Sequence, residues 1–121
     1  METPKIFESE YRFCQILWDN EPVRSSELVR LCQEILGWKQ STTYTVIKRL
    51  SQRGVLQNEH SVVTSLVSRQ QVQTAEIDEL IENRFNGSIP SFLAAFTDSN
   101  ALSKEDLDDI QKMIDTIRKG R

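Results

Sequence analysis

Residues 41–57 read STTYTVIKRLSQRGVLQ, and this stretch decides the fold because its hydrophobic pattern changes at Gly54. Before Gly54, apolar residues recur every three or four positions, which is the spacing of one helix face. The expected inward face consists of Thr43, Val46 or Ile47, and Leu50. After Gly54, a short apolar run predicts a strand. The stretch therefore predicts a helix that begins between Lys39 and Thr42 and ends at Arg53, followed by a strand.

Two further helices are predicted upstream of this stretch. The first spans about residues 8–19 and ends before Pro22, because proline disfavours the helical conformation in the residue that precedes it. The second follows a cap at Ser25 or Ser26 and ends at Gly37, where a glycine supplies a left-handed terminus. The chain therefore places three short helices before residue 54.

Two short antiparallel strands are predicted downstream, at residues 55–57 and 62–67, with a polar turn at 58–61 between them. Residues 23–24 are compatible with a third, very short strand. Three helices followed by a hairpin is the element order of a winged helix-turn-helix. The sequence thus predicts a mainly α fold with a small antiparallel β-hairpin, and a winged-helix domain over residues 1–70.

The remainder, residues 71–121, is predicted to be helical. A helix to Phe85 ends at Asn86-Gly87, a short apolar helix follows, residues 98–100 form a turn, and Ser103 caps the last helix. About 50 residues in such helices bury too little surface for a core of their own. We therefore expect a helical dimerisation domain in a symmetric homodimer. Its predicted interface consists of Ile89, Phe92, Leu93, Phe96, Leu107, Ile110, Ile114 and Ile117.

The distribution of charge favours a nucleic-acid partner, although the net charge is −3. No acidic residue occurs between Glu34 and Glu59. The basic residues of this interval are Lys39, Lys48, Arg49 and Arg53. A local basic segment is what the neutralisation of DNA phosphates requires.

The predicted helix that ends at Arg53 starts with a run of hydroxyl side chains, which suit both phosphate oxygens and base edges. The residues predicted to contact double-stranded DNA are Lys39, Ser41, Thr42, Thr43, Tyr44, Thr45, Lys48, Arg49 and, in the hairpin turn, His60. Two alternatives remain open: hydroxyls at a helix start also serve as caps, and His60 also suits a turn that makes no DNA contact.

Enzyme, metal and cofactor functions are not predicted. The chain has one histidine, and its two cysteines, Cys14 and Cys32, do not have the spacing of metal ligands. We expect both cysteines to be buried thiols, with a redox role as the alternative. No apolar run approaches the roughly 20 residues of a membrane span, and the N-terminus lacks a signal-peptide profile. A cytoplasmic protein without membrane insertion is expected.

Several motifs together resemble the penicillinase/methicillinase repressor family over about residues 6–117. They are Leu17-Trp18, Gly37-Trp38, Thr42-x-x-Thr45-x-x-x-Arg49-Leu50-x-x-x-Gly54-Val55-Leu56, Phe85-x-Gly87-Ser88 and Leu102-Ser103-x-Glu105-x-Leu107. The resemblance implies an N-terminal winged helix and a C-terminal helical domain that entwines with its twin. It also implies repression at dyad-symmetric operators, often of antibiotic-resistance or metal-handling genes.

The chain departs from the family pattern at three points. It lacks the cysteine-rich end of copper-responsive members, so copper sensing is not expected. Members that respond to β-lactams are cleaved at an Asn-Phe bond in the dimerisation helix, and a membrane sensor protease is then a partner; the matching pair here is Ala95-Phe96. Lys39 replaces the usual Ser or Thr after the tryptophan, which would move the helix cap to Ser41.

The function predicted from these observations is a homodimeric transcriptional repressor of resistance or stress genes, bound to dyad-symmetric operator DNA. The alternative is a winged-helix adapter for protein–protein interaction, in which the basic helix binds an acidic partner and no DNA sequence is recognised. Selection from random DNA separates the two, because only a repressor enriches a palindrome.

Overall fold

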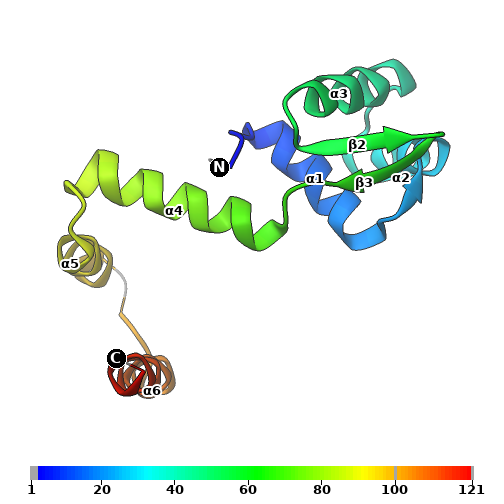
Figure 1. Cartoon of the computed structure of the whole chain (residues 1–121). Coiled ribbons are helices and arrows are strands. Elements are labelled where there is room, and N and C mark those ends of the chain that lie inside the picture. Colours follow the sequence, from blue (N-terminus) through cyan, green and yellow to red (C-terminus); the bar gives the residue numbers. More distant parts are fainter. Residues whose placement is uncertain (1–2, 100, 121) are drawn as a thin grey trace. The chain divides into compact units, whose positions relative to one another are not determined.

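The computed structural model describes residues 3–99 and 101–120. The chain divides into two compact units (Figure 1). The first unit ends at Asp78 and the second begins at Glu79. The first unit includes the start of α4 (Arg69–Phe85), with Val72 buried in its core. Each unit is described below by itself.

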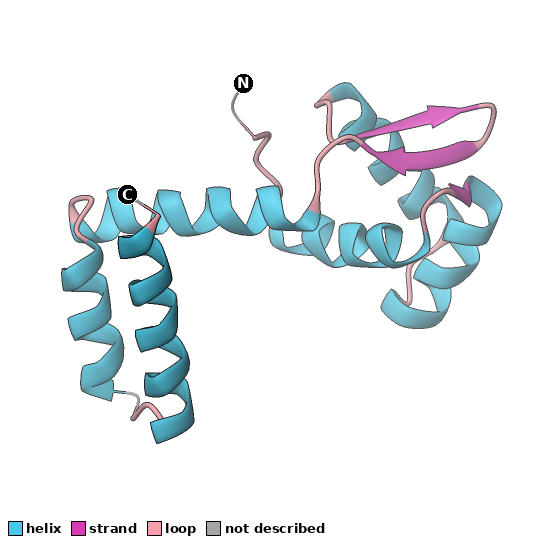
Figure 2. Cartoon of the chain, turned by 60° about the horizontal axis from the view of Figure 1, so that its bottom comes forward, coloured by secondary structure: helices cyan, strands magenta, loops and turns pink. Residues whose placement is uncertain are grey.

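The first unit has the element order that the sequence predicts, and Figure 2 separates its helices and strands by colour. Before the start of α4 its elements are α1 (Glu8–Asn20), β1 (Val23–Arg24), α2 (Ser25–Leu36), α3 (Gln40–Gln52), β2 (Leu56–Glu59) and β3 (Val62–Ser65). The change of periodicity at Gly54, which has a φ of +78°, is confirmed as the boundary between helix and hairpin. The winged-helix fold is therefore confirmed.

The three strands form one antiparallel sheet in the order β1-β3-β2. The hairpin turn is shorter than predicted, because Asn58 and Glu59 still pair with β3. Only His60 and Ser61 lie between the strands, with φ values of 52° and 65°. Positive φ at both central residues is the geometry of a tight hairpin turn whose twist matches that of its strands.

The core of the first unit lies between α1, α2, α3 and the sheet. Its fully buried apolar side chains include Phe13, Leu17, Leu28, Leu50, Leu56 and Val63. The Phe13 and Trp38 rings stack with centroids 6.0 Å apart, and Trp18 Nε1 donates to the Val67 carbonyl at 3.0 Å. Thr43, Val46, Ile47 and Leu50 are all buried, which confirms the predicted inward face of α3.

Two predicted helix caps are wrong. Ser25 is the first residue of α2 and not its cap, because Arg24 holds the extended cap conformation. Likewise α3 starts at Gln40 with Lys39 as its cap residue, so the cap does not move to Ser41. Gly37, with a φ of +71°, ends α2 as predicted.

The second unit contains the end of α4, α5 (Ile89–Ser99) and α6 (Lys104–Lys119). The Ser103 hydroxyl accepts from the Asp106 N–H at 3.0 Å, which confirms the predicted cap of α6. The turn predicted at residues 98–100 is wrong for Asp98 and Ser99, which continue α5, while Asn100 lies outside the described residues. One turn earlier, the Thr97 hydroxyl donates to the Leu93 carbonyl at 2.8 Å, so this polar residue is compatible with the helix.

Among the described residues, no helix combines the length and the apolar character needed to cross a membrane.

Candidate nucleic-acid interface

The outer face of α3 carries most of the predicted DNA-contacting side chains. Ser41, Thr42, Tyr44, Thr45 and Lys48 are all exposed, as is Lys39 just before the helix. The chain folds this way because the inward positions of α3 are occupied by the apolar face that packs on α2 and β2. The outer positions are thereby left as a polar surface on a regular helix.

Thr43 does not belong to this surface. Its side chain is 0% exposed and lies in the core of the first unit. The prediction of a DNA contact for Thr43 is therefore wrong, and the prediction that Thr43 belongs to the inward face of α3 is the one that holds. Thr43 precedes Val46, Ile47 and Leu50 by helical spacing, so it shares their face.

The N-terminus of α3 is open to an anion. The first turn of α3 contains no acidic residue, and the Lys39 side chain does not cap it. Within the helix the Thr43 N–H donates to the Lys39 carbonyl at 3.2 Å. The N–H groups of residues 40–42, by contrast, have no intrahelical acceptor, and the helix dipole places partial positive charge at this end. A phosphate oxygen could accept hydrogen bonds from these N–H groups.

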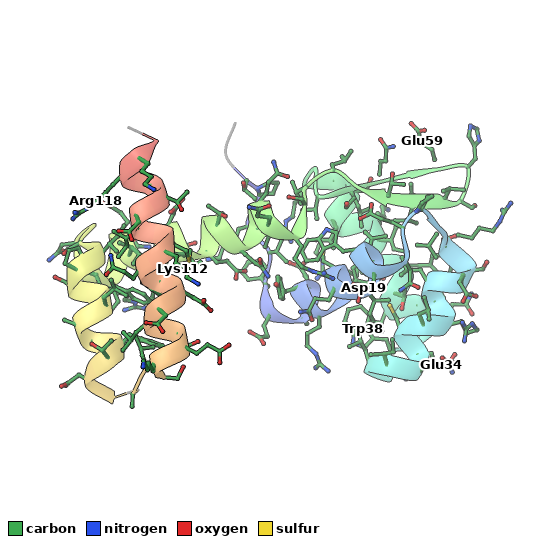
Figure 3. All side chains as sticks on the ribbon, turned by 90° about the horizontal axis from the view of Figure 1, so that it is seen from below. Asp19, Glu34, Trp38, Glu59, Lys112 and Arg118 are labelled. Atoms are coloured by element: carbon green, nitrogen blue, oxygen red, sulfur yellow. The ribbon has the colours of Figure 1, made fainter. Side chains whose placement is uncertain are left out.

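A shallow cavity of about 380 Å³ lies beside this end of α3. It is lined by Ser9, Trp38, Ser41, Thr42, Thr45, Val46 and Arg49. Figure 3 labels Trp38, which precedes α3 and forms part of the lining. The Thr45 hydroxyl donates to the Ser41 carbonyl at 2.8 Å. Ser9 was missed by the sequence reasoning, because nothing in the sequence places the start of α1 next to α3.

The basic residues of α3 are not all available to a partner. Glu10 of α1 is 2% exposed, and its carboxylate accepts from Arg53 Nη1 at 2.8 Å. Arg49 Nη1 lies 3.6 Å from the same carboxylate. The segment between Glu34 and Glu59 contains no acidic residue, but the fold brings Glu10 of α1 next to its basic side chains. Arg53 forms an ion pair with this buried carboxylate, and its charge is therefore used within the protein. Lys39 and Lys48 form no ion pair within the part of the chain that the structure describes.

The environment of Glu10 keeps this carboxyl group ionised. Burial raises its pKa, but hydrogen bonds from Arg53 and from the Phe7 N–H, together with the charges of Arg53 and Arg49, outweigh burial and lower the pKa from 4.5. The Phe7 N–H donates at 3.0 Å. The sequence offered no signal for this pair, because Arg53 is 43 residues away from Glu10.

The two cysteines are buried, as expected. Burial raises the pKa of Cys14 to about 12 and that of Cys32 to about 11. Both thiols are therefore protonated near neutral pH and poor nucleophiles. The described residues contain no group of three or more His, Cys, Asp or Glu side chains that could hold a metal ion.

The apolar residues predicted for a dimer interface are largely uncovered in the single chain. Ile89 is 60% exposed, Leu107 52% and Ile117 54%. Leu93, Phe96, Ile110 and Ile114 are also exposed, and Phe92 is half-buried, with its ring 5.5 Å from that of Phe85. Ala95 and Phe96, the predicted cleavage pair, are both exposed and lie inside α5.

Comparisons with known proteins agree with this architecture. The family described as penicillinase repressor matches residues 6–116. An uncharacterized 16.5 kDa protein in the ptsI 3′ region of Latilactobacillus sakei is 28% identical over 116 residues, which are 93% of this chain and 80% of that protein. A similar solved structure is that of Bacillus licheniformis BlaI, in its monomeric form in complex with the blaP half-operator. The TM-score is 0.51 at 21% identity, over 59% of this chain and 93% of that one, so this likeness bears on the fold.

Proposed function

This chain belongs to the penicillinase repressor family, and we propose that it is a DNA-binding transcriptional repressor that acts as a homodimer on dyad-symmetric operators. The observation that carries the proposal is the outer face of α3, where exposed hydroxyls, a free Lys48 and an uncapped helix N-terminus lie together. The BlaI complex with a half-operator supports a DNA partner for this fold.

In the proposed complex α3 lies in the major groove. Ser41, Thr42 and Thr45 contact base edges or phosphates from the side of α3 that is turned away from the core. Lys39, Tyr44, Lys48 and Arg49 contact the DNA backbone, and His60 approaches a phosphate from the hairpin turn. Arg49 contributes least to the electrostatic attraction, because Glu10 partly neutralises it.

The dimer is supported by the exposed apolar side chains of α5 and α6. In α6 Leu107, Ile110, Ile114 and Ile117 recur at helical spacing on one face, yet α6 buries no residue within the chain. An exposed apolar stripe of this kind marks an association surface. A second copy of the chain is the occupant that also suits DNA recognition, because a two-fold protein reads a two-fold site.

We propose resistance or stress genes as the targets and the cytoplasm as the location. Release from DNA by a membrane sensor protease would act at Ala95–Phe96. Because this pair lies inside α5, the helix must open locally before a protease can bind its backbone in extended form.

Selection of bound duplexes from random DNA tests the proposal. A repressor enriches a palindrome whose half-sites lie about one helical turn, or a multiple of it, apart. Failure to bind any duplex at low salt would refute the proposal, and binding of an acidic protein alone would favour the adapter. Sedimentation tests the dimer independently: a stable monomer that is insensitive to Phe92 and Phe96 substitutions would refute that part.

A further inference from the structure

Arg24 lies next to the hairpin turn, although the two are far apart in sequence. It is the second residue of β1, and β1 pairs with β3 so that Arg24 faces Val62, the residue directly after the turn. The next backbone group reinforces this position, because the Ser25 N–H donates to the Ser61 carbonyl at 2.8 Å. Arg24 is therefore fixed beside His60 and Ser61 by backbone contacts.

The side chain of Arg24 is on the outer face of the sheet. Val23 is 7% exposed and packs into the core, while Arg24 is exposed, as expected for successive residues of a strand. In the order β1-β3-β2 the cross-strand row of Arg24 continues through Val62 to Glu59. Glu59 is labelled in Figure 3 and is the acidic residue of this row. Two strand spacings, or about 10 Å, separate it from Arg24.

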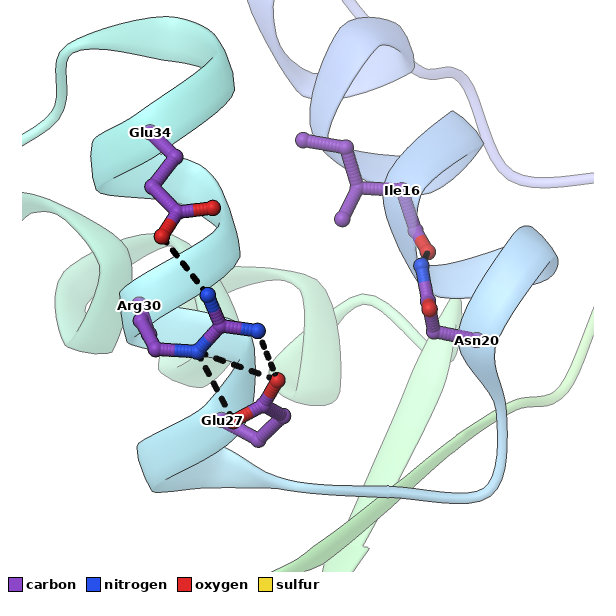
Figure 4. A network of polar contacts seen from close by, with 5 residues as sticks. All are labelled: Ile16, Asn20, Glu27, Arg30 and Glu34. Atoms are coloured by element: carbon purple, nitrogen blue, oxygen red, sulfur yellow. Dashed lines mark hydrogen bonds and ion pairs between the residues drawn. The ribbon is translucent and has the colours of Figure 1, made fainter.

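Arg24 carries a charge that no partner neutralises. It forms no ion pair with any residue that the structure describes. Arg30, in the middle of α2, is the opposite case. Figure 4 shows its guanidinium between Glu27 and Glu34, with 2.6 Å between Nη1 and the Glu34 carboxylate. Of these two arginines, Arg24 is therefore the one whose charge is unpaired.

The position of Arg24 matches the path of a DNA backbone. In a helix-turn-helix the first helix crosses the backbone while the second lies in the major groove. Here these helices are α2 and α3, and Arg24 directly precedes α2. A guanidinium at this point can bind two oxygens of one phosphate. On the basis of the proposed function, we propose that Arg24 is a further DNA-binding residue, which contacts a backbone phosphate beside the hairpin turn.

Fluorescence anisotropy of labelled duplexes, measured over a range of salt concentrations, tests this proposal. The probes are the duplex enriched by selection and a mixed-sequence duplex of the same length. Loss of one phosphate contact lowers the salt slope by about 0.9 for each bound protomer. Arg24→Ala should therefore weaken binding about 5-fold per protomer at about 0.15 M salt and about 2-fold at about 0.5 M. The affinity for both duplexes should fall by the same factor, because a phosphate contact carries no sequence information.

Arg30→Ala is the matched control, since it removes the same charge from α2, the helix that follows Arg24, at a site where two carboxylates already pair with the arginine. It should leave the salt slope unchanged, and Arg24→Lys should retain the wild-type slope because the charge is kept. Equal slopes for wild type and Arg24→Ala would overturn the inference while the proposed function stands. Absence of DNA binding by the wild type would overturn both. Circular dichroism confirms that each variant is folded.

Discussion

Replacement of Glu10 by glutamine tests whether the ion pair between α1 and α3 stabilises the first unit. The substitution keeps the shape of the side chain and an oxygen for the Phe7 N–H, but it removes the negative charge that faces Arg53 and Arg49. Loss of one partner from a buried pair typically costs about 3–5 kcal/mol. Arg53 remains 29% exposed, so water solvates part of the charge left behind, and we expect a cost of about 2–3 kcal/mol.

Arg53→Met should cost more than Glu10→Gln. The methionine variant leaves Glu10, at 2% exposure, with only Arg49 at 3.6 Å as a charged partner. Its expected cost is therefore about 3–5 kcal/mol at neutral pH. Urea titration followed by tryptophan fluorescence measures both costs, because Trp18 and Trp38 lie in the first unit. Equal or reversed costs would refute the reasoning from burial.

The cost of Glu10→Gln should also depend on pH. The folded protein lowers the pKa of Glu10 from 4.5, so the ionised form is bound more favourably in the folded state. Its contribution is fully present above about pH 4.5 and is lost as the pH falls through the lower folded pKa. The stability difference between wild type and variant should therefore be constant from pH 7 to about pH 5 and shrink below that. A difference of less than about 0.5 kcal/mol at pH 7, or one that persists undiminished to pH 3, would contradict the assignment.

Three further predictions concern α3 and the thiols. Thr45→Ala should weaken binding to the selected operator more than to mixed-sequence DNA, which competition anisotropy measures; equal losses would argue against a base contact. Lys48→Ala should weaken binding to all duplexes about equally and reduce the salt slope by about 1, and a slope that does not change would remove Lys48 from the interface. Cys14 and Cys32 should react with a thiol reagent at pH 8 only as urea unfolds the chain, because burial raises the pKa of both thiols; rapid labelling of the native protein would contradict this.

The sequence predicts the fold well where local signals and tertiary packing agree. The periodicity change at Gly54, the left-handed terminus at Gly37 and the cap at Ser103 are all confirmed. Each depends on residues within a few positions of one another, so short-range conformational preferences suffice to specify it. The very short strand at residues 23–24 also agrees, although it owes its existence to pairing with β3.

The candidate site was less predictable, because it depends on contacts between distant parts of the chain. The residue types and spacing of α3 indicate its polar and buried faces, but no local pattern places Ser9 of α1 beside that helix. Glu10 in α1 and Arg53 at the end of α3 are 43 residues apart in sequence, and no local pattern encodes their pairing. The same is true of Arg24, which reaches the hairpin turn through β1.

The hydrogen bond within α3 from Thr45 to Ser41 restricts the bases that this threonine could recognise in the proposed complex. The single hydroxyl proton of Thr45 is engaged by the Ser41 carbonyl, so the oxygen offers only lone pairs to a ligand. In the proposed complex it can accept from the amino group of adenine or cytosine but cannot donate to the acceptor edge of guanine. Its methyl group adds an affinity for the methyl of thymine. If Thr45 reads a base as proposed, guanine is disfavoured at that operator position, and Thr45→Ser would keep the acceptor while losing the preference for thymine.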